Sequence, residues 1–133
     1  MSVKISGRAK VQIEVIRKNI KPFEMGGICF GLVNKDKIII TELVGMLKDD
    51  ISEVNGFVRN SCKEYNKIIA KKWKHSDGLI NYVGEWHTHN EDYPTPSNID
   101  NKLLNDIQEY TNRIGYKPIV LIIGLKDNRI MIG

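Results

Sequence analysis

Two histidines and one aspartate in the middle of the chain have the types and the spacing of a metal site. One residue separates His87 from His89, and ten residues separate His89 from Asp100. Residues 79–88 are predicted to form a strand, in which residues two apart project from the same face. The two imidazoles would therefore lie side by side, which is the beginning of a metal site.

Asp100 is expected to approach the same site from the first turn of a helix. Ser97 is a good N-cap residue, and Asp100 follows it by three positions. Asp100 shares one helical face with the apolar residues Leu103, Leu104 and Ile107. Because that apolar face must be buried, Asp100 is expected to be buried with it, and a buried carboxylate needs a partner. Two histidines and one carboxylate leave one tetrahedral position for water, as in catalytic zinc sites.

Each of these features also has a purely structural explanation. A His-x-His pair alone is common, and Asp100 alone could be the far half of a capping box. Glu91 and Asp92, in the proline-rich loop between the two parts of the site, are expected to be solvated loop residues. The combination of strand, histidine pair, N-cap and inward-facing aspartate is what favours metal binding.

Hydrophobic periodicity and turn residues predict the elements that position this site. The predicted helices cover 9–19, a segment that opens near Ser52 and continues to Trp73, and 99–114. In the first of them, the buried face is expected to contain Val11, Val15, Ile16 and Ile20. Predicted strands cover 3–6, 28–33, 38–44, 79–88, 119–123 and 129–132.

This order of elements predicts the fold class. Strands and helices alternate as β-α-β-β-α-β-α-β-β, which indicates an α/β or α+β layered domain with a mixed β-sheet flanked by helices. With no repeat or linker in the sequence, residues 1–133 are expected to form a single domain.

Composition excludes several classes of protein. Hydrophobic residues make up 41% and charged residues 27% of the 133 residues, which is typical of a globular chain and not of a collagen-like or disordered one. The longest apolar run, 119–125, is too short to cross a bilayer, and no apolar signal segment follows Met1. The two cysteines suggest no disulfide framework, so we expect a cytoplasmic location and no membrane partner.

The charge pattern argues against a nucleic-acid partner. The net charge is +4, and the densest basic cluster is Lys71, Lys72 and Lys74. These lysines lie at the end of a predicted helix, where cations complement the helix dipole. A nucleic-acid binder usually collects its charge into a larger patch.

The spacing of the candidate ligands resembles a known signature. His87-x-His89, ten residues and Asp100, with Pro96 and Ser97 before the aspartate, resemble the JAMM motif of the JAB/MPN zinc metalloproteases. The segment 24–31, EMGGICFG, is similar to the segment that carries the catalytic glutamate of that family. The resemblance implies a cytidine-deaminase-like α/β fold.

The context of the histidines, YVGEWHTH over 82–89, resembles a prokaryotic JAB branch. Members of that branch resemble the deconjugating peptidases of bacterial CBASS anti-phage and mobile-element operons, where activating and conjugating enzymes accompany them. Asn90 is a departure, because many relatives have proline there. It affects the shape of the loop and does not remove a ligand.

The resemblance implies a role for each candidate residue. His87, His89 and Asp100 would be the zinc ligands. Glu24 would be the general base that takes a proton from the attacking water and passes it to the leaving amine. Ser97 would donate a hydrogen bond to the oxyanion.

Glu85 is a rival to Glu24. It lies two residues before His87, so the strand period places it on the same face as the histidines. Proximity in sequence favours Glu85 as the base, and the family resemblance favours Glu24. Glu85 could instead fix the orientation of an imidazole that binds the metal.

The function implied by the resemblance is that of a zinc-dependent isopeptidase. It would hydrolyse the amide bond after the C-terminus of a ubiquitin-like protein or of another conjugated protein. Activating and conjugating enzymes of the same operon are the further partners it implies, in a CBASS-type antiviral pathway.

Three other functions fit the sequence less well. A zinc nucleobase deaminase would need a His-x-Glu and a Pro-Cys-x-x-Cys pattern, and the sequence has neither. A RadC-like domain acting in DNA maintenance has a similar ending of the motif, but the Glu85-Trp86 pair and the weak basic patch count against it. An MPN-like scaffold without metal would not need the three ligands, all of which are present.

Overall fold

A six-stranded mixed sheet is the centre of the fold, in the order β1-β3-β2-β6-β7-β8. The computed structural model describes residues 1–20, 24–45, 51–53, 56–58, 62–112 and 115–133. The elements are β1 (Ser2–Ile5), α1 (Gly7–Lys18), β2 (Gly26–Asn34), β3 (Lys37–Gly45), β4 (Ile51–Glu53), β5 (Gly56–Val58), α2 (Cys62–His75), β6 (Asn81–Thr88), α3 (Asn98–Asn112), β7 (Ile119–Ile123) and β8 (Asn128–Ile132).

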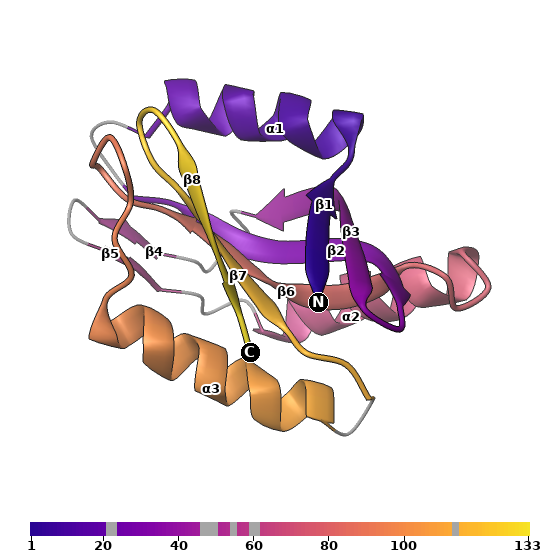
Figure 1. The fold of residues 1–133 in the computed structure, drawn as a ribbon. Helices are drawn as coiled ribbons and strands as arrows, with labels where there is room; N and C mark the ends of the chain where they lie inside the picture. Colours follow the sequence, from indigo (N-terminus) through magenta and orange to yellow (C-terminus); the bar gives the residue numbers. More distant parts are fainter. Residues whose placement is uncertain (21–23, 46–50, 54–55, 59–61, 113–114) are drawn as a thin grey trace.

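Helices cover both faces of this sheet (Figure 1). Helix α1 lies on one face, where Ala9 and Ile13 pack in a buried cluster with Trp86 of β6. Helices α2 and α3 lie on the other face, where Tyr65 and Ile107 pack in a second cluster. All five residues of β7 are buried, as expected for a strand covered on both sides. The predicted layered α/β fold with a mixed sheet is confirmed.

The buried face of α1 differs from the predicted one. Val11 and Val15 are 66% and 57% exposed, whereas Ile13 is only 2% exposed. The buried stripe of α1 contains Ala9 and Ile13, with Ile16 partly buried beside them; Ile20 is buried just after the helix ends. Those positions follow a spacing of four and three residues, which keeps them on one side of the helix. The prediction was wrong for Val11 and Val15, which lie off this stripe, and right for Ile16 and Ile20, which pack in the buried cluster.

The predicted start of the second helix was also wrong. Residues Ile51–Glu53 pair with Gly56–Val58 as a small antiparallel hairpin, and α2 begins only at Cys62. Gly56, the first residue of β5, follows Asn55 in the sequence, and the dipeptide Asn-Gly favours tight hairpin turns. The end of the helix was predicted better, because α2 ends at His75, two residues after the predicted end at Trp73. Gly78 then adopts a left-handed conformation and donates a backbone hydrogen bond to the Trp73 carbonyl.

A bulge in β6 changes which side chains share a face. Its register against β2 shifts so that Val83 has no partner there. Gly84 has φ of +152°, and an added Cβ would lie 1.8 Å from the carbonyl oxygen of Ile119. The extra residue places Tyr82 on the same face as Glu85. Trp86 packs on the opposite face, beside α1.

Helix α3 connects two parallel neighbours in the sheet. Strands β6 and β7 pair in parallel, and α3 makes the crossover between them. The predicted buried face of α3 is confirmed for Asp100 and Ile107, which are both buried, although Ile99 is exposed. Gly115 follows with φ of +86° and donates a backbone hydrogen bond to Thr111; residues 113–114 lie outside the described part.

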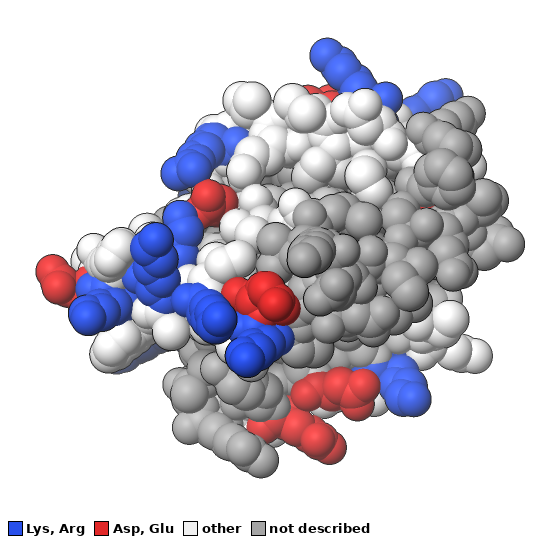
Figure 2. Space-filling model, turned by 180° about the vertical axis from the view of Figure 1, so that it is seen from behind, with Lys and Arg blue, Asp and Glu red and all other residues white. Residues whose placement is uncertain are grey.

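In Figure 2, several Lys and Arg side chains lie together at the left, and others lie apart at the top and lower right of the same view. The sequence of α2 contains five lysines, and its last turn carries Lys72 and Lys74. Lys72 forms an ion pair with Glu42 and lies over the ring of Phe30. Among the helices that the structure describes, none is long and apolar enough to span a membrane.

Candidate metal centre and neighbouring carboxylates

The three predicted ligands come together at the end of β6. His87 and His89 lie at that end, and Asp100 lies in the first turn of α3. The Nε2 atoms of the two histidines are 3.2 Å apart. Asp100 Oδ1 is 2.6 Å from His87 Nε2, and Asp100 Oδ2 is 3.6 Å from His89 Nε2.

The chemistry and spacing of these atoms fit a zinc ion. Bonds of about 2.0–2.1 Å in a tetrahedral site place neighbouring ligand atoms roughly 3.3 Å apart. One ligand atom from each residue lies within 4.8 Å of the others. Asp100 is only 2% exposed, so it differs from the exposed acidic residues that often cluster without binding a cation. The three residues could therefore hold a zinc ion.

A reciprocal capping interaction fixes Asp100. The Ser97 backbone N–H and hydroxyl both donate to Asp100 Oδ2, at 2.7 and 3.0 Å. The Asp100 N–H donates back to the Ser97 hydroxyl oxygen at 3.2 Å. This capping box stabilises the start of α3 and leaves Asp100 Oδ1 to face His87.

In the chain without metal, the three residues form an acid–base cluster. Burial alone would raise the pKa of Asp100, but hydrogen bonds with His87, His89 and the Ser97 backbone hold that pKa far below its ordinary value. The hydrogen bond with Asp100 raises the pKa of His89, and burial opposes it. The Asp100 carboxylate thus stabilises positive charge on His89.

Glu24 reaches the cluster through a backbone contact between two strands. Thr88 donates its N–H to the Met25 carbonyl at 2.9 Å, and its hydroxyl accepts the Met25 N–H at 2.8 Å. Glu24 accepts a hydrogen bond from the backbone of Asn90 and interacts electrostatically with both histidines. Burial raises the pKa of Glu24, while the histidines lower it.

Glu85, the rival candidate, lies in the apolar layer behind the histidines. It is buried, and the hydroxyl of Tyr82 donates to its Oε2 at 3.1 Å. Its charge also raises the pKa of the buried Cys29 thiol, after the larger effect of burial itself. The Glu24 carboxylate interacts electrostatically with both histidines and with Asp100.

Glu91 is a residue of the site that the sequence analysis missed. Its Oε1 lies 3.2 Å from His89 Nδ1 and accepts the Thr95 N–H at 2.6 Å. Glu91 is a loop residue whose side chain is 43% exposed, as expected, but it also contacts a candidate ligand; Asp92 is half exposed and lies 3.6 Å from Lys126. One feature of the sequence could have indicated this contact. Glu91 lies two residues after His89, which is close enough for its side chain to reach the imidazole.

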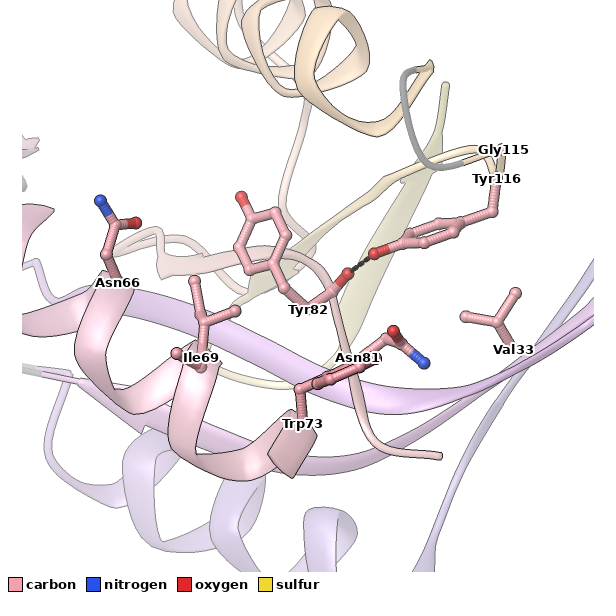
Figure 3. A pocket seen from close by; sticks show the side chains of 9 residues that line it. Val33, Asn66, Ile69, Trp73, Asn81, Tyr82, Gly115 and Tyr116 are labelled. Atoms are coloured by element: carbon pink, nitrogen blue, oxygen red, sulfur yellow. Dashed lines mark hydrogen bonds between the residues drawn. The ribbon is translucent and has the colours of Figure 1, made fainter. Parts of the chain in front are cut away.

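A separate cavity of about 950 Å³ lies at the other end of β6. Figure 3 shows Trp73 and Asn66 of α2 beside Asn81 and Tyr82, and the hydroxyl of Tyr116 donates to the Tyr82 carbonyl. Asn81 and Tyr82 begin the strand that the histidines end, so the cavity is distinct from the candidate metal centre.

Comparison with known proteins identifies the family. A family model described as prokaryotic homologs of the JAB domain matches residues 10–131. This chain belongs to the prokaryotic JAB-domain family. The predicted resemblance is thereby confirmed, and the matched range contains all three clustered residues and Glu24.

Two curated relatives from this comparison are named CD-NTase/cGAS isopeptidase. The one from Escherichia coli (strain TW11681) is 34% identical over 78% of this chain and 64% of its own length. The one from Enterobacter hormaechei subsp. hoffmannii is 29% identical over 76% of this chain and 55% of its own length. This JAB-domain chain thus matches less than two thirds of the length of either relative.

A solved structure shares the fold. The solution structure of a Desulfitobacterium hafniense protein superimposes with a TM-score of 0.61 over 98% of this chain and 81% of that one. The two sequences are only 15% identical, so the likeness concerns the arrangement of the JAB-domain sheet and helices alone.

Proposed function

We propose that this JAB-domain protein is a zinc-dependent isopeptidase that removes a conjugated protein from its target. The observation that carries the proposal is the convergence of His87, His89 and Asp100, with the Glu24 carboxylate interacting with both histidines. An amide bond needs an activated water, an acid for the leaving amine and a stabilised oxyanion. The chain has a residue for each task.

The metal would be held by Nε2 of His87, Nε2 of His89 and a carboxylate oxygen of Asp100. When bound, zinc supplies Lewis-acid chemistry: it polarises the scissile carbonyl and makes water a nucleophile near neutral pH. Asp100 keeps its orientation because Oδ2 is held by Ser97. The other oxygen, Oδ1, faces His87.

Glu24 would act as general base and then as general acid. In the ionised form it accepts the proton of the attacking water, and it then transfers that proton to the nitrogen of the leaving amine. Burial raises its pKa, which makes the carboxylate a stronger base than an exposed one. The backbone hydrogen bond from Asn90 fixes its position.

Ser97 would stabilise the oxyanion of the tetrahedral intermediate. Its hydroxyl oxygen accepts the Asp100 N–H, and its hydrogen is directed to Asp100 Oδ2. A hydroxyl can accept and donate at the same time, so Ser97 can keep the cap while its hydrogen rotates toward the substrate. The Ser97 backbone N–H retains Asp100 during that rotation.

The substrate class follows from the relatives' names. Because they are called CD-NTase/cGAS isopeptidases, we propose that the conjugated protein is a CD-NTase-type enzyme of a CBASS-type pathway. A ubiquitin-like protein is the second substrate type, and activating and conjugating enzymes of the same operon would form the conjugate. Cytoplasmic location and a single domain over residues 1–133 belong to this proposal.

The test is release of extra residues fused after the C-terminus of the conjugated protein. The purified chain is incubated with a CD-NTase fusion and, in parallel, with a ubiquitin-like fusion, each with and without a zinc chelator. We expect cleavage directly after the native C-terminus, lost with chelator and restored by zinc. The Glu24→Gln variant, which keeps the shape of the side chain, should be inactive.

Two results would overturn the proposal. One is a wild-type protein that binds no zinc, which would indicate an MPN-like scaffold. The other is a zinc-loaded protein that leaves both fusions intact while it processes DNA, which would favour a RadC-like role.

A further inference from the structure

We propose that Glu91 is a positioning residue that sets the orientation of His89 and couples this ligand to the loop that leads to Ser97. This inference rests on the proposed metal site. Nothing in the JAB motif assigns a role to Glu91, and its side chain is 43% exposed, as many residues without a role are. The argument comes from what its carboxylate and backbone contact.

One carboxylate oxygen serves two donors. Glu91 Oε1 is 3.2 Å from His89 Nδ1 and 2.6 Å from the backbone nitrogen of Thr95. A neutral imidazole carries its proton on only one nitrogen. When Nδ1–H donates to Glu91, the lone pair of Nε2 is free for a metal, and Nε2 is the atom that faces His87 and Asp100.

The backbone of Glu91 is held in place by the turn between β7 and β8. Leu125 donates its N–H to the Glu91 carbonyl at 2.8 Å. At Gly124, an added Cβ would lie 2.7 Å from that carbonyl oxygen and 2.6 Å from Pro94. The loop therefore packs directly on the turn. A carboxylate on so constrained a backbone can fix an imidazole in one orientation.

The shared oxygen also connects the metal ligand with the loop. Thr95 lies two residues before Ser97, so the same carboxylate orients His89 and holds the approach to Ser97. Coupling of two sites is reciprocal. We therefore expect zinc binding at His89 to slow hydrogen exchange of the Thr95 amide, and this effect to require the Glu91 side chain.

The experiment measures zinc affinity by competition with a chromophoric chelator, without any substrate. Glu91→Ala should weaken zinc binding about 10–100-fold, the usual effect of losing a partner of a metal-bound histidine. Glu91→Gln should stay within a few-fold of wild type, because its carbonyl oxygen can accept both hydrogen bonds. Asp92→Ala, which removes the neighbouring exposed carboxylate, is the matched control and should have no effect.

A second readout is the tautomer of His89, followed by nitrogen-15 NMR of the imidazole in the zinc-free protein. Asp100 attracts the proton at Nε2 in every variant, so the comparison is between variants: the Nδ1-protonated share of neutral His89 should be larger in wild type and in Glu91→Gln than in Glu91→Ala. Glu91→Ser, whose side chain is too short to reach the ring, provides a second variant if the alanine variant does not fold.

The inference fails if the alanine or serine variant keeps wild-type zinc affinity and an unchanged tautomer. It also fails if Glu91→Gln is as weak as Glu91→Ala, because charge rather than alignment would then be the cause. These outcomes are separate from the proposed function. A wild type that binds zinc but cleaves no fusion contradicts only the isopeptidase, and if zinc does not bind, the tautomer alone decides on Glu91.

Discussion

Met25 and Thr88 exchange two hydrogen bonds across neighbouring strands. The Thr88 N–H donates to the Met25 carbonyl, and the Thr88 hydroxyl accepts the Met25 N–H. Each partner is adjacent in sequence to residues of the candidate site: Glu24 precedes Met25, and His87 and His89 flank Thr88. This pair is therefore the structural reason why Glu24, just before β2, lies beside the histidines at the end of β6.

Replacement of Thr88 should separate activity from metal binding. Thr88→Val removes the acceptor of the Met25 N–H and should cost about 1–3 kcal/mol of folding free energy, because a polar group loses its partner. We expect zinc to remain bound and turnover to fall at least tenfold, since Glu24 loses its alignment. Thr88→Ser keeps the hydroxyl and is the control. Equal turnover in the valine and serine variants would contradict this role.

Glu24 and Glu85 should respond in opposite ways to loss of charge. Glu24→Gln should keep fold and zinc and lose about 10²–10⁴-fold in turnover, as expected for a general base. Glu85→Gln should lower thermal stability, since it disturbs the buried contact with Tyr82, and should keep most of the turnover. Fusion cleavage and thermal unfolding measure the two effects. An active Glu24→Gln beside an inactive Glu85→Gln would reverse the assignment.

Zinc content should depend on the clustered residues and not on histidine in general. Wild-type protein should contain about one zinc per chain by elemental analysis. His89→Ala and Asp100→Ala should lose it, because each removes one of three ligands. His75→Ala is the control, since His75 is exposed at the end of α2. Full zinc content in Asp100→Ala would exclude the proposed ligand set.

The metal-free protein should be more stable in mild acid than in base. The raised pKa of His89 contributes stability that is complete below its ordinary value of 6.5 and is lost as the pH rises through the folded value. The lowered pKa of Asp100 contributes stability above its ordinary value of 3.8, which is lost as the pH falls through the folded value. Both contributions are present together between these two ordinary values.

The measurement is thermal unfolding of wild type and Asp100→Asn in the presence of chelator. The melting temperature of wild type should exceed that of Asp100→Asn by several degrees more at about pH 5.5 than at about pH 8.5. The reason is that a charged histidine faces an ionised Asp100 only near the lower of these two pH values. Without this interaction, the difference between the two proteins would not vary with pH.

Gly84→Ala should be among the most damaging single changes. The added Cβ would overlap the carbonyl of Ile119, and φ of +152° is rare for other residues. We expect a loss of several kcal/mol or insoluble protein, measured by urea unfolding. Gly7→Ala, where nothing lies within 4 Å of the added Cβ, is the control. A stable Gly84→Ala would mean that β6 has no such bulge.

The order of strands and helices could be predicted because periodicity and turn residues agree in most of the chain. The buried strand β7 and the hairpin of β2 and β3 are examples. The small β4–β5 hairpin was missed because its two strands have only three residues each, too few to show alternation. The bulge at Gly84 was missed because it depends on the carbonyl of Ile119, far along the chain.

In the candidate site, too, some residues could be placed by local sequence rules and others could not. The neighbourhood of His87, His89 and Asp100 follows from strand period and helix capping, which are local rules. The position of Glu24 depends on pairing of β2 with β6, and only the family resemblance pointed to it. The contact of Glu91 depends on how a loop packs on the β7–β8 turn, which no period in the sequence encodes.

The crossover from β6 through α3 has a consequence for the order of folding. All three candidate ligands belong to this one stretch of chain, whereas the contact that brings in Glu24 joins residues 63 positions apart. Local contacts form before distant ones, because closing a long loop costs more entropy. A nascent chain would therefore be able to capture its cation before β2 has docked. Such an intermediate would hold the cation without Glu24 beside it, so the proposed hydrolysis would begin only after β2 has paired with β6.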